Sequence, residues 1–203
     1  MRPLTVHTGT AVPLRIAGVD TDQIIPARFC TRSTRTGHAD ALFADWRTDP
    51  AFVLNDPAYH GATVLIAGPN FGIGSSREYA VWALADYGFR VVIAERFGDI
   101  FRGNAMLNGL PALRLPAAAV ARLWELVEAD PATPVTVDLR RCEIRCGGLS
   151  WEFELDEDTR SRLMSGLDAI GATLRHETEI AAYERRRGSR GPGGLAAHHG
   201  EQG

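Results

Sequence analysis

The sequence lacks long apolar runs and an excess of charge of one sign. No stretch of its 203 residues approaches the roughly 18 apolar residues that a membrane-spanning helix needs. Charged side chains make up 23% of the chain and the formal net charge is −3, which is too balanced for a protein that binds nucleic acid. The N-terminal residues contain His7, Pro13 and Arg15 and do not form a secretory signal. We therefore expect a cytoplasmic protein with neither a membrane nor a nucleic acid partner.

Cysteine is scarce as well. Cys30, Cys142 and Cys146 are an odd number of thiols in a chain without an export signal, which argues against a disulfide framework. Cys142 and Cys146 flank a segment that we interpret as strand, and residues four apart on a strand are too far apart to hold one ion easily. Neither CxxC nor HxxxH occurs. We therefore predict no metal ligands in this chain, so that a metal in the reaction must be held by another chain.

Hydrophobic residues make up 45% of the sequence, which suits one globular α/β domain with its own core. Apolar runs predict buried strands at residues 62–67 and 90–94. Between them, glycines indicate a turn, and apolar residues at helical spacing predict a helix over residues 76–87 that ends at Gly88. This βαβ arrangement predicts a mixed sheet with helices on both sides.

The second half of the chain continues the alternation of strands and helices. Helices are predicted at residues 99–108, 116–130, 158–170 and 177–187, and strands at 110–115, 134–139 and 149–155. The last two strands are expected to pair with each other as antiparallel neighbours. After Arg187 the sequence is glycine-rich and has no core pattern, so we expect a domain of residues 1–187 and a disordered tail of residues 188–203.

The most informative stretch is NFGIGSSRE at residues 70–78, between the first predicted strand and its helix. Gly72 and Gly74 allow a tight turn and let a ligand approach the backbone. The predicted helix directs its free N–H groups and partial positive charge toward this turn. Two hydroxyl groups and a guanidinium stand there, those of Ser75, Ser76 and Arg77. Together these groups predict a binding site for a carboxylate or a phosphate.

Better-known motifs are excluded at this turn. A dinucleotide-binding GxGxxG would need glycine at position 77, a P-loop would need Gly-Lys, and a nucleophile elbow would need glycine two residues after its serine. A structural alternative stays open, because Ser75 and Glu78 also fit a capping box that only closes the helix. Arg77 favours the binding site, because a cation in a first helical turn opposes the helix dipole unless an anion binds there.

Two carboxylates lie near the N-terminus, where Asp20 and Asp22 flank Thr21. They either cap a turn or act as an acid or a proton relay beside the basic site. Residues 32–37 are polar, basic and end in glycine, which predicts a mobile surface loop.

Several segments, in this order, resemble one known family. They are VDTDQIIPARF at residues 19–29, TRTG at 34–37, NFGIGSSRE at 70–78 and FGDIFRGNAMLNGLP at 97–111. The chain resembles, over residues 7–184, the small subunits of bacterial 3-isopropylmalate dehydratases, which belong to the aconitase superfamily. The resemblance implies a single swivelling β/β/α domain of the aconitase C-terminal type.

The resemblance also implies a role for each site residue. Ser75 would be the base that removes a proton from carbon, and Ser76 and Arg77 would bind a substrate carboxylate. Thr21 and Asp22 would lie near the reacting groups. The variable part of the substrate would meet the loop after Phe29, whose residues include Cys30, Thr31, Arg32 and Arg35.

A partner chain follows from the same resemblance. A large subunit would carry a [4Fe-4S] cluster whose iron removes hydroxide from a small dicarboxylic hydroxy acid, and the pair would interconvert 2- and 3-isopropylmalate in leucine biosynthesis. Two residues depart from the family pattern: Tyr79 stands where histidine is usual, and Ile73 where cysteine or threonine is common. Two alternatives therefore stay open, a paralogous dehydratase subunit for homocitrate or another substituted malate, and a non-catalytic anion-binding module.

Overall fold

A parallel sheet forms the centre of this computed structural model, which describes residues 1–31, 33–74 and 78–166. In that part of the chain the sheet has the strand order β2-β3-β4-β5. Its strands are Ala11–Leu14, Val64–Ala67, Val91–Ala94 and Ala112–Arg114. Every residue of β2, β3 and β4 is buried, as expected for parallel strands covered on both faces.

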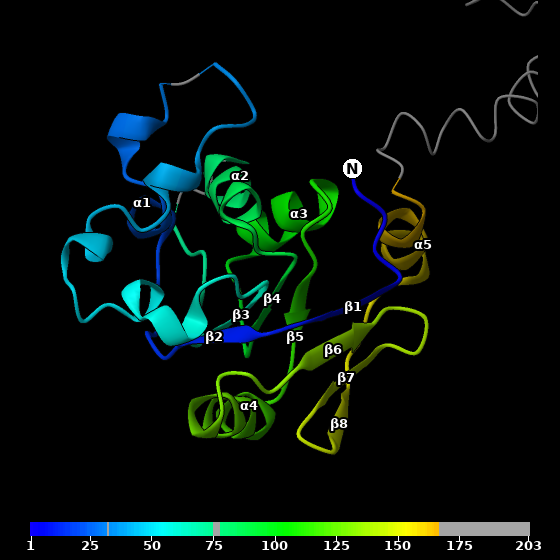
Figure 1. Cartoon of the computed structure of the whole chain (residues 1–203). Coiled ribbons are helices and arrows are strands. Elements are labelled where there is room, and N and C mark those ends of the chain that lie inside the picture. Colours follow the sequence, from blue (N-terminus) through cyan, green and yellow to red (C-terminus); the bar gives the residue numbers. More distant parts are fainter. Residues whose placement is uncertain (32, 75–77, 167–203) are drawn as a thin grey trace, which may run out of the picture. The chain divides into compact units, whose positions relative to one another are not determined.

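Helices cover both faces of this sheet (Figure 1). α2 (Glu78–Tyr87) and α3 (Asp99–Leu107) pack against each other on one face, and α4 (Ala117–Ala129) crosses the other. The predicted strand–helix–strand unit is confirmed, because β3 and β4 pair in parallel on either side of α2. The α/β class is therefore confirmed, and all described residues belong to one compact unit.

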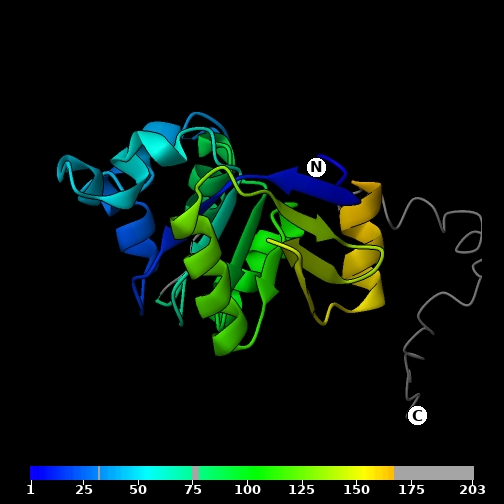
Figure 2. The same ribbon diagram turned by 60° about the horizontal axis from the view of Figure 1, so that its bottom comes forward.

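The remaining described strands form a second sheet, which is antiparallel (Figure 2). Its order is β1-β6-β7-β8, with strands Val6–Gly9, Val135–Asp138, Glu143–Cys146 and Leu149–Glu152. The sequence predicted one mixed sheet, but the strands separate at Thr10. Val6–Gly9 pairs with β6, whereas Ala11–Leu14, one residue later, pairs with β3.

The predicted pairing of residues 134–139 with 149–155 is wrong, because β7 lies between these two strands. The strand predicted between Cys142 and Cys146 is confirmed as β7, but its pattern does not indicate which strands it pairs with. Gly147 and Gly148, with φ of +55° and +79°, make a tight turn that pairs β8 with its nearest neighbour in sequence.

A long excursion connects β2 to β3 and contains only short helices among its described residues. α1 spans Thr21–Ile24, and 3-10 turns follow at Ala27–Phe29, Ala39–Ala41, Trp46–Thr48, Val53–Asn55 and Pro57–Tyr59. These blue to cyan segments gather at one side of the parallel sheet (Figure 1). Phe43 anchors the excursion in the core, where its ring stacks on Trp46 with centroids 5.4 Å apart.

The last described helix, α5 (Glu157–Ser165), is shorter than the predicted helix 158–170. It ends because Gly166 adopts a left-handed conformation with φ of +70°, which the helical periodicity did not reveal. The predicted helix 177–187, the boundary at Arg187 and the tail lie outside the described residues. No described helix is long and apolar enough to cross a membrane.

Candidate functional site

The glycine turn after β3 is held in place by its neighbours. Gly72 and Gly74 have φ of +74° and +93°, conformations that favour glycine. A Cβ atom on Gly72 would lie 2.3 Å from Cγ of Phe101, so the ring of α3 packs directly on this backbone. The Gly98 N–H donates to the Phe71 carbonyl at 2.9 Å, which ties the turn to the segment after β4. The conformation of the turn is therefore held by packing against α3 and by a hydrogen bond to the segment after β4.

The Asp-Thr-Asp segment pairs with this turn. The N–H groups of Gly72 and Ile73 donate to the Val19 carbonyl at 2.7 and 3.2 Å, and the Thr21 N–H donates to the Ile73 carbonyl at 3.0 Å. Thr21 is buried, and a Cβ atom on Gly74 would lie 3.7 Å from its Oγ1. The structure thus brings together two predicted parts of the site that are about fifty residues apart in sequence.

The two carboxylates of that segment have different surroundings. Asp20 is the N-cap of α1: its Oδ1 accepts from the Gln23 N–H at 2.7 Å, and the Asp20 N–H donates to Gln23 Oε1 at 2.8 Å. The capping interpretation is therefore confirmed for Asp20. Asp22 lies in the first turn of α1 and is exposed, with its carboxylate open to solvent.

The other side of the site is the start of α2. Oε1 of Glu78 accepts a hydrogen bond from Nδ2 of Asn108 at 3.0 Å, and Nε1 of Trp82 donates to Oδ1 of the same amide at 3.1 Å. Asn108 thereby ties the first turns of α2 to the end of α3. No sequence pattern indicates this role, because a single asparagine after a helix usually marks only its end.

The predicted substrate loop lies against these elements. Cys30 is half-buried beside the core, and Thr31 is exposed. Arg35 is exposed, with its guanidinium carbon 5.9 Å from the ring centroid of Trp82. Tyr79, the residue that departs from the family pattern, is half-buried and packs edge-on against Trp82 with centroids 4.8 Å apart.

Four predicted site residues lie outside the described part of the chain: Arg32, Ser75, Ser76 and Arg77. The last three connect Gly74, on the fixed turn, to Glu78, at the start of α2. Both ends of that connection are held by hydrogen bonds or close packing.

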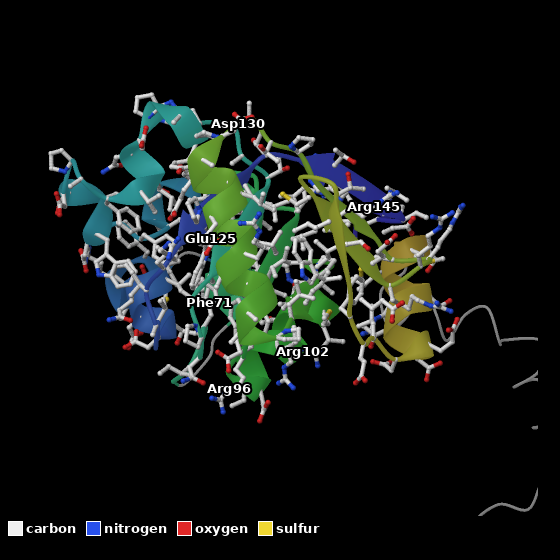
Figure 3. All side chains as sticks on the ribbon, turned by 90° about the horizontal axis from the view of Figure 1, so that it is seen from below. Phe71, Arg96, Arg102, Glu125, Asp130 and Arg145 are labelled. Atoms are coloured by element: carbon white, nitrogen blue, oxygen red, sulfur yellow. The ribbon has the colours of Figure 1, made fainter. Side chains whose placement is uncertain are left out.

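A charged cavity of about 780 Å³ opens where β4 and β5 end, and the sequence did not predict it. Its charged lining consists of Glu95, Arg96, Arg102, Arg114, Glu152 and Glu154. Arg96 and Arg102 lie at the same end of the described unit (Figure 3). Burial, and then the neighbouring Arg114, lower the pKa of Arg102. Equal numbers of arginines and glutamates give this cavity no clear preference for an anion or a cation.

Metal ligands do not gather in the described residues, where no three His, Cys, Asp or Glu side chains lie close together. Cys30, Cys142 and Cys146 are free thiols within the same residues. Burial raises the pKa of Cys146, so its thiol stays protonated and is a poor metal ligand. The described part of the site consists of the backbone of the glycine turn, the buried Thr21 and the start of α2.

Comparisons with known families agree with the α/β fold. The family model described as "Aconitase C-terminal domain" matches residues 1–118. A second model, LeuD_N, matches residues 121–157. A third model, for the C-terminal domain of the 3-isopropylmalate dehydratase small subunit, matches residues 170–192.

Individual relatives match over nearly their full length. The 3-isopropylmalate dehydratase small subunit of Salinispora tropica is 62% identical over 92% of this chain and 96% of its own. The protein of the same name from Streptomyces coelicolor is 57% identical over 93% and 96%. A solved structure of 3-isopropylmalate dehydratase from Methanocaldococcus jannaschii superposes with a TM-score of 0.65 at 24% identity, covering 89% of this chain and 100% of the other. At that identity the superposition shows a shared fold.

Proposed function

We infer the function from the family to which this chain belongs, the small subunits of 3-isopropylmalate dehydratase, built on the aconitase C-terminal domain. The chain is the small subunit of this hydro-lyase of leucine biosynthesis. With its large subunit it interconverts 2-isopropylmalate and 3-isopropylmalate by dehydration and rehydration in the cytoplasm. One observation carries this conclusion: identity of 62% extends over 96% of a relative of that name.

Ser75 is proposed as the base that removes the proton from the substrate carbon. Removing a proton beside a carboxylate builds negative charge, which Arg77 and the N-terminal dipole of α2 stabilise. Ser76 and Arg77 bind the carboxylate itself. Thr21 and Asp22 face the reacting groups, a role supported by the hydrogen bonds that hold Thr21 on the glycine turn.

The loop with Cys30, Thr31, Arg32 and Arg35 is proposed to contact the substituent of the malate. This role is supported by the chain order, in which the loop follows α1, and by its attachment to α2, since the Thr34 carbonyl is bonded to His38, whose ring packs on Trp82. Arg35, whose guanidinium lies over the ring of Trp82, also connects the loop to α2.

The large subunit is proposed to hold a [4Fe-4S] cluster, since the described residues of this chain offer no ligand set for one. The cluster supplies a Lewis acid for the departing hydroxide. The contribution of this chain is the base and the carboxylate site. A free serine is a poor base, so Ser75 needs the positive surroundings that the assembled enzyme provides.

The test is Ser75→Ala in enzyme assembled from this chain and its large subunit. Turnover of 2-isopropylmalate should fall about 10²- to 10⁴-fold, the usual contribution of a general base, while the two chains still copurify. The matched control is Ser150→Ala, at an exposed position of β8, which should leave turnover unchanged. Full activity of Ser75→Ala would remove the proposed base, and turnover of homocitrate or citramalate alone would identify a paralogous enzyme.

A further inference from the structure

His38 follows the predicted substrate loop and is completely buried between that loop and α2. Its Nε2 lies 2.8 Å from the Thr34 carbonyl oxygen, and its backbone N–H donates to Oδ2 of Asp86 at 2.9 Å. A carbonyl oxygen can only accept, so Nε2 must carry the proton and donate. The imidazole thereby joins the loop, at Thr34, to the helix that begins directly after the proposed catalytic residues.

Aromatic contacts hold the imidazole on α2. The ring centroid of His38 is 5.5 Å from that of Tyr79, edge-on, and 5.8 Å from that of Trp82. The segment after His38 is fastened to the same helix, because Arg47 donates to the Ala39 carbonyl at 3.4 Å and lies over the ring of Tyr87. The end of the loop is thus attached to α2 at several points.

The surroundings of Nδ1 indicate which interaction of His38 requires an imidazole ring. Nδ1 of His38 is buried and has no hydrogen-bond partner among the described residues. A phenyl ring would fill a similar space and pack on the same aromatic rings without burying an unpaired nitrogen, which is unfavourable. The feature that only the imidazole provides is therefore the Nε2 hydrogen bond to the Thr34 carbonyl.

We propose that His38 is a positioning residue that fixes Ser33–Gly37 against α2 and thereby sets which malate substituent the enzyme accepts. The proposal rests on the function inferred above, in which this loop contacts that substituent. The loop has two supports. It begins after α1, whose Thr21 is bonded to the glycine turn, and it ends on α2 through His38. Because the second support fixes Thr34 and its neighbour Arg35, loss of the Nε2 bond should change how the substituent is recognised.

The attachment itself can be tested on the isolated full-length chain by amide hydrogen exchange. His38→Phe keeps the ring and removes the bond, so exchange of the N–H of residue 38, which donates to Asp86, should accelerate about tenfold while β3 and β4 keep their protection. His38→Gln can place an amide donor near the Thr34 carbonyl and should restore most of the protection. His60→Gln, at an exposed histidine beyond the last 3-10 turn, is the control and should change nothing.

The consequence for recognition is tested in the assembled enzyme with 2-isopropylmalate and the methyl-substituted citramalate. For His38→Phe the ratio of kcat/KM between the two substrates should fall about tenfold, mainly through KM for the larger one, and His38→Gln should restore it. If His38→Phe does not fold, Asp86→Ala removes the neighbouring attachment and should shift the ratio in the same direction.

Either of two kinetic results would overturn the proposal: an unchanged ratio in His38→Phe, or equal losses in His38→Phe and His38→Gln, which would assign the effect to ring packing. Unchanged hydrogen exchange in His38→Phe would also contradict it. If the inferred function is wrong, the unmodified assembled enzyme will turn over neither substrate. The hydrogen-exchange measurement does not depend on turnover, so it still tests whether His38 fixes the loop.

Discussion

Glu78 illustrates how a single side chain acquires a role that its sequence motif does not show. Its spacing from Ser75 fits a capping box, one of two interpretations of this motif, and in the structure its Oε1 accepts from Nδ2 of Asn108 at 3.0 Å. The carboxylate therefore ties the first turn of α2 to α3. The sequence did not predict the roles of Asn108 and His38. Asn108 bonds side chains that are distant in sequence, and His38 bonds the backbone carbonyl of Thr34, so neither interaction produces a local sequence pattern.

Arg77→Lys should lower kcat/KM for 2-isopropylmalate by about tenfold to a hundredfold, because lysine keeps the charge but loses the two-point contact with a carboxylate. Steady-state kinetics of the assembled enzyme measure this change. The control is Arg122→Lys, an exposed arginine of α4 that pairs with Glu125. An unchanged kcat/KM in Arg77→Lys would count against the proposed carboxylate site.

At the scale of elements, the glycine turn and α3 allow a paired test. Gly72→Ala should lower the free energy of unfolding by at least about 2 kcal/mol, because its φ of +74° disfavours a side chain and the new methyl group would overlap Phe101. Gly103→Ala, in α3 with no atom near its added Cβ, should raise it by about 0.5–1 kcal/mol. Urea denaturation of both variants measures the two effects, and equal changes would show that the turn is not fixed as described.

The N-cap of α5 should make stability depend on pH. Hydrogen bonds from Thr159 hold the pKa of Asp156 below its ordinary value. A carboxylate with a lowered pKa stabilises the folded state above its unfolded pKa, about 3.9, and loses that contribution as the pH falls through the folded value. Asp156→Ala should therefore cost about 1 kcal/mol at pH values near neutral, and less in acid.

Urea denaturation at neutral and acid pH measures this dependence. Asp158→Ala is the control, since Asp158 is exposed in the first turn of α5 but is not its cap. A pH-independent difference between Asp156→Ala and the unmodified chain would contradict the capping argument.

At the scale of the whole molecule, the proposed division of labour makes the isolated chain inactive and colourless. Spectra of the purified chain after incubation with iron and sulfide measure this directly, and an iron-dependent absorbance band would contradict it. Addition of the reconstituted large subunit should restore turnover.

The predicted boundary at Arg187 provides a second test at this scale. A chain truncated after Arg187 should keep its unfolding temperature, its association with the large subunit and its turnover, because the removed residues lack a core pattern. Loss of association on truncation would show that residues 188–203 belong to the functional protein.

The sequence by itself determined the local features of this protein. Buried strands, the glycine turn, the βαβ unit and the limits of α4 follow from periodicity, backbone preferences and capping, all of which act within about ten residues. The chemistry expected of Ser75, Ser76 and Arg77 also came from adjacent residues, and the family resemblance from short segments in a fixed order.

Only the tertiary structure decided which segments meet. The strands belong to two sheets that separate at Thr10, and β7 lies between two strands that were predicted to pair. Thr21 is hydrogen-bonded to the glycine turn, and His38 is buried against α2. These relations depend on strand pairing and packing between distant segments, whose free energy comes from excluding water over the whole core. A local sequence pattern does not specify which segments pair or pack together, because many segments are apolar enough to occupy the same position in the core.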